Sequence, residues 1–276
     1  MAQQGDHYSL DDQGLWVEKV GPWALDKLKI VTDYIQASSA ARRRYLESGA
    51  AYIDVFSGPG RSKIRTTGKY IDGSPVAAFR KAKGSLAAFT DIHISDADAD
   101  LLGSAENRLI ALGAPVYATP GPASTAMPRI VQGLNSSGLH FAFLDPHNLG
   151  TLSFDLFETL AKLKRIDIIV HVSLSDLQRN ADRYTSAAHS EFDRFAPGWR
   201  RQIRTDMNQT SLRAAILQYW SDKVMGLGLP RAEHCELITG PNNQRLYWLI
   251  FLGKHELAHN LWAKISSAAK SPELDF

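Results

Sequence analysis

Short apolar runs alternate along the chain with segments in which apolar residues recur at helical spacing. The apolar runs predict strands over 50–56, 115–118, 141–144 and 166–172, and an alternating segment predicts a strand over 86–95. The helical spacing predicts helices over 22–46, 74–81, 101–112 and 154–163. Because strands that alternate with helices favour parallel crossovers, the pattern predicts an α/β fold with a doubly wound, Rossmann-like sheet.

The pattern changes after the fifth predicted strand. Residues 176–230 are helical in spacing and rich in arginine, which predicts a helical insertion within a single domain over 1–276. Two further strands, His234–Thr239 and Arg245–Gly253, flank a turn and predict an antiparallel hairpin that closes the sheet, before a last helix over 257–265.

Two segments have weak patterns. Residues 1–20 are polar at first and predict a loosely held lead-in, in which Trp16 and Val17 could still dock on the body of the protein. Residues 61–69 predict a polar and basic loop that is long enough to fold over a ligand. Arg42, Arg43 and Arg44 form a dense basic run, which predicts a solvated helix end, with a phosphate-facing patch as the alternative.

An acid and a glycine turn follow the first predicted strand. Glycine lacks Cβ, so the backbone of such a turn can approach a bound cofactor closely. We expect Asp54 at the rim of that site, although a turn of this kind can also be only a turn. The predicted cofactor contacts of this segment are Asp54, Phe56, Ser57, Gly58, Pro59 and Gly60.

Acids also follow the second predicted strand, at Asp96 and Asp98. In nucleotide-binding α/β folds an acid at this place accepts hydrogen bonds from both ribose hydroxyls. We therefore add Asp96 and Asp98 to the predicted cofactor contacts. The alternative is that one of them only caps the helix over 101–112.

The fourth predicted strand ends in Asp145, Pro146, His147 and Asn148. Asp145 can accept a proton or hydrogen bond, His147 can act as a general base near neutral pH, and Asn148 can both donate and accept. Because open α/β sheets bind ligands at strand ends, these three are the predicted catalytic residues. A capped loop before the helix over 154–163 is the alternative.

Arginines and aromatic residues alternate in the predicted insertion. Arginine beside aromatic rings can clamp a polyanion and stack on unpaired bases, whereas a solvated helical cap with a small apolar seam is an equal alternative. The residues are Arg179, Arg183, Tyr184, Phe192, Arg194, Phe195, Trp199, Arg200, Arg201, Arg204 and Arg213.

Composition narrows the class of protein. Of 276 residues, 44% are hydrophobic and 22% charged, as in ordinary soluble globular proteins, and a net charge of +2 indicates no partner. The single Cys235 excludes an internal disulfide framework and a multi-cysteine metal site, and no metal site is predicted. With no apolar run of membrane-spanning length, we expect a cytoplasmic protein without a membrane partner.

The predicted order of elements resembles the class I S-adenosylmethionine-dependent methyltransferase fold. The resemblance implies S-adenosylmethionine as cofactor, with the glycine turn against its methionine part and the acid after the second strand on its ribose. Asp54, Ser57 to Gly60 and Asp96 match these positions.

Six short motifs, in order, resemble the three-Cys-motif partner family, TcmP. They are Trp23 with Lys27 and Leu28, Tyr52 to Gly60, Gly73 to Pro75, Leu144 to Pro146, Arg179 with Asn180, and Leu246 to Phe251. The resemblance spans nearly the whole chain. It implies a methyltransferase-like fold and a neighbour-encoded partner that carries three cysteines and is of radical-S-adenosylmethionine type.

Two departures bear on the reaction. Thr119 to Gly121 lacks the acid that many such enzymes place after strand three to bind adenine, and the stretch at Asp145 lacks the aromatic residue that holds a flipped base. We therefore expect methyl transfer to a nucleic acid or nucleotide-like acceptor, but not an ordinary adenine-N6 reaction. A non-catalytic module that binds S-adenosylmethionine or substrate is the alternative, and a nucleotide-binding protein of another kind is a third.

Overall fold

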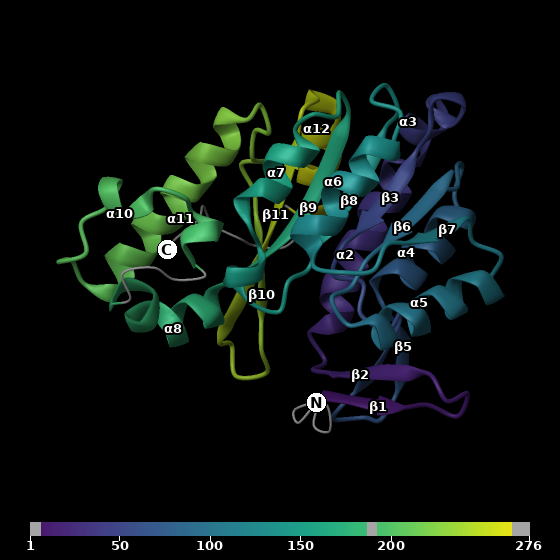
Figure 1. Ribbon diagram of the computed structural model, residues 1–276, viewed down its shortest axis with the longest axis horizontal. Coiled ribbons are helices and arrows are strands. Elements are labelled where there is room, and N and C mark those ends of the chain that lie inside the picture. The colour runs from purple at the N-terminus through teal and green to yellow at the C-terminus, as the bar shows by residue number, and fades with distance from the viewer. Residues whose placement is uncertain (1–6, 187–191, 267–276) are drawn as a thin grey trace. The chain divides into compact units, whose positions relative to one another are not determined.

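The chain forms two units in the computed structural model, Met1–Asp145 and Pro146–Phe276. The structure describes residues 7–186 and 192–266 (Figure 1). The prediction of a single domain with an insertion stays a prediction.

Parallel strands form the main sheet of the first unit. In sheet order they are β8 (His140–Leu144), β3 (Ala51–Asp54), β6 (Asp91–Ile94) and β7 (Val116–Ala118). β3 is central: its Tyr52 lies beside Phe141 on one side and Ile92 on the other, and all four of its residues are buried. A continuous apolar run is typical of a strand that is covered on both faces.

Helices connect these strands. They are α2 (Ala24–Ala37), α4 (Ser74–Lys83), α5 (Ala99–Ala111) and α6 (Ala123–Gly133), and α4 packs against both α2 and α5. The order β3, α4, β6, α5, β7 with parallel strands is a Rossmann-like crossover series. The predicted α/β fold with parallel strands is confirmed.

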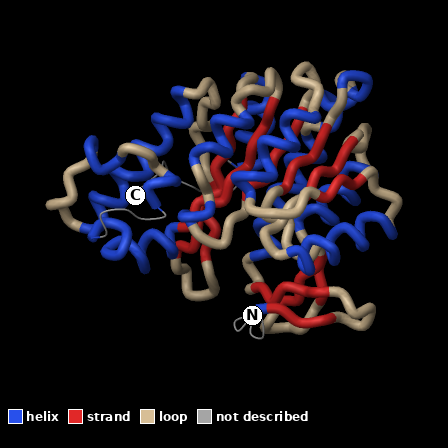
Figure 2. The backbone as a smooth tube through the Cα atoms, in the orientation of Figure 1, coloured by secondary structure: helices blue, strands red, loops and turns tan. Residues whose placement is uncertain are grey.

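A second sheet in this unit was not predicted. It consists of β1 (Tyr8–Leu10), β2 (Trp16–Val20), β4 (Arg61–Ile64) and β5 (Tyr70–Asp72), in that order, and it forms the separate group of strands beside the N label in Figure 2. β2 and β4 pair in parallel, and the other neighbours are antiparallel. The predicted lead-in and the predicted loop over 61–69 are therefore wrong where strands form, because pairing between distant segments supplies their hydrogen bonds. Residues 1–6 of the lead-in lie outside the described residues.

Arg42 also departs from prediction. It lies in the short helix α3 (Ser39–Arg43), is 2% exposed, and donates to the carbonyl oxygens of Ala87 and Ile35 at 2.9 and 3.1 Å. Its guanidinium lies 4.5 Å from the centre of the Phe89 ring, and burial lowers its pKa to about 10. The predicted solvated helix end is wrong at Arg42, while Arg43 and Arg44 are exposed.

The second unit contains an antiparallel sheet. β11 (Arg245–Gly253) pairs with β10 (Glu236–Thr239) on one side and β9 (Ile166–Ser173) on the other, so the predicted C-terminal hairpin is confirmed. α7 (Phe154–Leu160) precedes β9, and α12 (Glu256–Ser266) follows β11. Within the described residues, no helix is both long and apolar enough to cross a membrane.

The arginine-rich segment of this unit is helical, as predicted. Its helices are α8 (Leu174–Ser186), α9 (Phe192–Phe195), α10 (Trp199–Gln202) and α11 (Gln209–Gly226).

Its aromatic rings are buried and stack on one another, Tyr184 on Phe192 at 4.7 Å and Phe195 on Trp220 at 5.2 Å between centroids. Because Trp199 is also fully buried, these rings form the apolar seam of the second alternative, and the expectation that they stack on unpaired bases is wrong.

Candidate functional site

Asp54, at the end of β3, is the centre of a buried polar cluster. Its carboxylate accepts hydrogen bonds from the hydroxyls of Ser74 at 2.6 Å and Tyr52 at 3.0 Å, and from the N–H of Phe56 at 3.2 Å. Burial raises the pKa of Asp54 to about 7, although these three hydrogen bonds act to lower it.

Two details of this cluster were not foreseen. We expected Asp54 at the rim of a site, but it is fully buried. Ser74, the first residue of α4, donates to Asp54, while Gly73 occupies the cap position of the helix.

The loop after β3 has a backbone that requires glycine. Gly58 and Gly60 have φ of +53° and +74°, and a Cβ on Gly60 would lie 3.1 Å from the Cα of Ala105 on α5. The N–H of Ser57 donates to the Ser95 carbonyl, and the N–H of Gly58 donates to the carboxylate of Asp96, both at 3.0 Å. The structure thus brings the predicted cofactor loop, Phe56 to Gly60, together with Asp96.

The two acids after β6 have different roles in the fold. Asp98 accepts from the N–H groups of Asp100 and Leu101 and caps α5, as in the capping alternative. Asp96 accepts from Asp98 with one oxygen and from Gly58 with the other, so it joins the end of β6 to the glycine loop.

Asp145, which follows β8, forms an ion pair with Lys27 of α2. Both side chains are 18% exposed. The charge of Asp145 also contributes, as the smallest cause, to the raised pKa of Asp54. Lys27 was part of a family motif, but the sequence assigned it no role, because nothing in the local pattern pairs residues 118 positions apart.

His147 and Asn148 belong to the second unit. The Asn148 side chain accepts from the N–H of Thr151 at 3.0 Å and caps the short 3-10 helix η2 (Leu149–Thr151), which matches the capped-loop alternative. His147 is exposed. The catalytic roles of both residues stay predictions.

Asp176, near the start of α8, is a buried residue that the sequence analysis missed. Its carboxylate accepts from the N–H of Leu149 at 3.0 Å, the Asn180 amide at 2.7 Å and the Tyr184 hydroxyl at 2.9 Å. The spacing of Asp176, Asn180 and Tyr184 along α8 is the only sequence signal, because residues four apart share one helix face. Asn180 of the Arg179–Asn180 motif therefore holds Asp176. Among the described residues, no group of three or more His, Cys, Asp or Glu side chains is placed to hold a metal ion.

Comparisons with known proteins give similarities of fold. No protein-family model and no curated protein sequence matches the chain. Protein LPL1258 from Legionella pneumophila, of the family model DUF519, is similar in structure with a TM-score of 0.49 and 12% identity, over 83% of this chain and 89% of that chain.

Two further solved structures are O-methyltransferases. The enzyme from Bacillus cereus in complex with SAH has a TM-score of 0.48 and 10% identity, over 85% of this chain and 82% of that chain. TomG from Streptomyces achromogenes in complex with SAM has a TM-score of 0.46 and 11% identity, over 80% of this chain and 79% of that chain. Similarity at this level assigns no activity to this chain, and its resemblance to TcmP stays a prediction from the motifs.

Proposed function

We propose that the chain binds S-adenosylmethionine at the loop Phe56 to Gly60 and transfers its methyl group to a nucleic acid or nucleotide-like acceptor. The observation that carries the proposal is the hydrogen bond from Gly58 to Asp96. It places the acid after the second strand of the parallel sheet at the glycine turn after the first, where Rossmann-like folds bind the ribose of a nucleotide.

The residues of the first unit fit the parts of this cofactor. Asp96 is a carboxylate, the group that accepts from ribose hydroxyls in such folds, and the positive φ of Gly58 and Gly60 opens the loop backbone to the amino-acid portion. The sulfonium supplies an activated methyl group when bound. Asp145, at the end of β8, would align the acceptor and receive its proton, and Lys27 holds that carboxylate in place.

The acceptor and the partner rest on different support. Arg179, Arg194 and Arg201 are exposed on the second unit and can contact phosphate, whereas Arg204 is paired with Asp206. The side chain of Arg183 lies outside the described residues. The three-cysteine partner of radical-S-adenosylmethionine type is supported by the six sequence motifs alone.

Isothermal titration with S-adenosylmethionine tests the cofactor. We expect the wild-type chain to bind it and Asp96→Asn to weaken the affinity by about tenfold or more, because a carboxylate makes stronger hydrogen bonds than an amide oxygen. Asp100→Asn is the matched control: it removes an exposed acid four residues away and should leave affinity unchanged. Absence of binding heat in the wild type, at high micromolar protein, would refute the proposal.

A second function is favoured by the ion pair at Asp145. An ammonium bound to this carboxylate competes with an acceptor for its oxygens, which suits a module that binds S-adenosylmethionine or substrate for the partner without chemistry. Transfer of a labelled methyl group by the isolated chain to RNA, DNA or nucleotides would exclude the module. Transfer that needs the partner, together with wild-type cofactor binding in Lys27→Met, would support it.

A further inference from the structure

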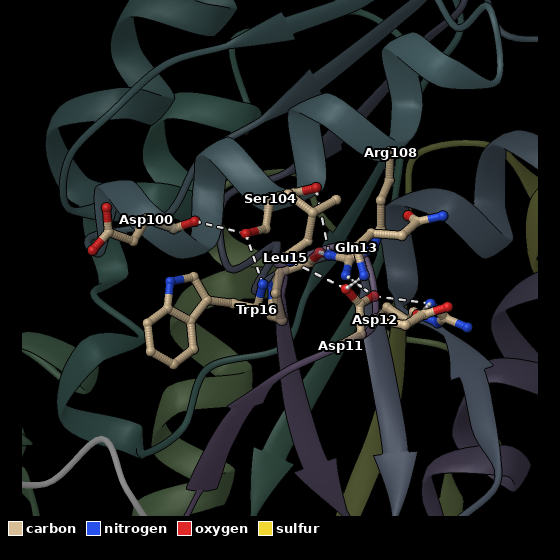
Figure 3. A network of polar contacts seen from close by, with 10 residues as sticks. Asp11, Asp12, Gln13, Leu15, Trp16, Asp100, Ser104 and Arg108 are labelled. Carbon is tan, nitrogen blue, oxygen red and sulfur yellow. Dashed lines mark hydrogen bonds and ion pairs between the residues drawn. The ribbon is translucent and has the colours of Figure 1, made fainter.

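A network of hydrogen bonds holds the start of the chain, and its centre is Asp11 (Figure 3). Asp11 lies between β1 and β2, and its side chain is fully buried. One carboxylate oxygen accepts from the N–H groups of Gln13 at 3.0 Å and Leu15 at 3.1 Å. The other accepts from Arg61 and Arg108, both at 2.8 Å.

Arg108 extends this network to the glycine loop. One terminal nitrogen of its guanidinium donates to Asp11 and the other donates to the carbonyl oxygen of Pro59. The side chain is 9% exposed, and it comes from α5, so it joins the start of the chain to the loop Phe56 to Gly60. A planar fork with fixed donors is suited to hold two acceptors at a set spacing.

Other contacts fasten the β1–β2 hairpin, defined as residues 8–20, to the same elements. The N–H of Trp16 donates to the Ser104 hydroxyl of α5 at 3.1 Å, as Figure 3 shows. β2 pairs in parallel with β4, which begins directly after Gly60, with Glu18 opposite Ser62. The hairpin is therefore attached both to β4, the strand that follows the loop, and to α5, the helix beside the loop.

Side chains of the hairpin also reach the loop. A Cβ on Gly58 would lie 4.0 Å from a carboxylate oxygen of Glu18 on β2. Tyr8 on β1 has a raised pKa, first because of burial and then because of the negative charges of Glu18, Asp96 and Asp98. Glu18 thus lies beside Gly58, and Tyr8 lies close enough to Asp96, the proposed ribose contact, for its charge to act on the phenol.

We propose that the β1–β2 hairpin forms a wall of the cofactor site and that Asp11 and Arg108 are positioning residues, which set the loop for its ligand. The proposal rests on the proposed function for the identity of the ligand. Its physical content is a coupling: the loop has its binding geometry when the hairpin is docked, so a ligand that prefers this geometry must in turn favour the docked hairpin.

The charge of Asp11 matters for this coupling. Burial alone would raise its pKa, but the hydrogen bonds from Arg108, from the backbone N–H groups and from Arg61 outweigh burial and lower the pKa to about 2. Asp11 is therefore ionised at neutral pH. Asparagine in its place would offer one carbonyl oxygen and would point an N–H₂ group at donors.

Titration of S-adenosylmethionine into three variants tests the positioning roles. Asp11→Asn and Arg108→Lys should weaken affinity by about tenfold or more, the second because a single ammonium keeps the charge but cannot bridge both acceptors. Asp12→Asn is the matched control, since it makes the same change at the next residue, whose side chain is 84% exposed and lies 3.7 Å from Arg61, compared with 2.8 Å for Asp11. Wild-type affinity in both Asp11→Asn and Arg108→Lys would overturn the proposal.

Amide hydrogen exchange separates positioning from a general loss of stability. In the wild type, S-adenosylmethionine should slow exchange in the β1–β2 hairpin, and this gain should vanish in Asp11→Asn but persist in Asp12→Asn. No ligand-dependent slowing in a wild type that binds would overturn the coupling.

A ligand-free comparison keeps the two proposals distinguishable. Without ligand, the loop amides of Ser57 and Gly58 should exchange faster in Arg108→Lys than in Asp12→Asn. Equal rates would overturn the positioning role whatever the ligand is. If the wild type does not bind S-adenosylmethionine but the two variants differ in this way, only the proposed function is refuted.

Discussion

Replacing Asp54 by asparagine tests the electrostatics at the centre of the candidate site. The folded chain keeps a proton on Asp54 up to its pKa of about 7, whereas the unfolded chain releases it near the ordinary value of 3.8. Unfolding between these values therefore releases a proton, and stability falls as pH rises through this window. The stabilising contribution is complete below pH 3.8 and is lost above pH 7.

The magnitude follows from the two values. They differ by about 3 pH units, and each unit corresponds to about 1.36 kcal/mol, so the wild type loses at most about 4 kcal/mol across the window. Asp54→Asn does not titrate, and its amide can exchange hydrogen bonds with the hydroxyls of Tyr52 and Ser74. We expect the variant to gain stability relative to the wild type as pH rises from about 4 to 8.

Urea unfolding of both proteins at several pH values measures this difference. Glu236 is a second source of the same pH dependence, because burial also raises its pKa to about 7. The control is therefore the Glu236→Gln variant, in which this second contribution to stability is removed. Asp54→Asn should flatten the pH dependence in a background of Glu236→Gln as well. An unchanged pH dependence in Asp54→Asn, with an intact fold, would show that Asp54 ionises normally and would refute the reasoning.

Two further predictions concern stability, each measured by urea unfolding. Gly60→Ala should destabilise by about 1 to 3 kcal/mol, because φ is +74° and the new Cβ would lie 3.1 Å from the Cα of Ala105; Gly103→Ala in α5, with nothing within 4 Å, should instead stabilise by about 0.5 to 1 kcal/mol. Equal effects would contradict this account of the loop. Arg42→Met should cost about 3 kcal/mol through lost hydrogen bonds and the lost contact with Phe89, and a loss below about 1 kcal/mol would show that the buried guanidinium is dispensable.

The parallel strands were predictable because β3 and β8 are short apolar runs and β6 alternates between polar and apolar residues. β3 and β8 are buried at every position, so their sequences carry a continuous signal. The glycine loop was predictable for the same kind of reason, since positive φ restricts the residue type. Asp96 was predictable from its place after a strand. Only the structure shows that Asp98, and not Asp96, caps α5.

The second sheet and the two ion-pair networks were not predictable. β4 contains two basic residues and β5 is short and partly exposed, so neither has the apolar alternation of a strand. They form because β2 supplies a backbone partner from a segment that is distant in the chain. Lys27 with Asp145 and Asp11 with Arg108 span 118 and 97 positions, and a local pattern holds no information about such pairs.

The distance in sequence between Asp11 and Arg108 has a consequence for synthesis on the ribosome. When Asp11 has been made, its partner on α5 is still 97 residues away. At a rate of about 5 to 20 residues per second, the hairpin waits roughly 5 to 20 seconds for the side chain that holds it. The backbone of β2 also has no parallel neighbour until β4 emerges, so residues 8–20 cannot complete their contacts before α5 has been made.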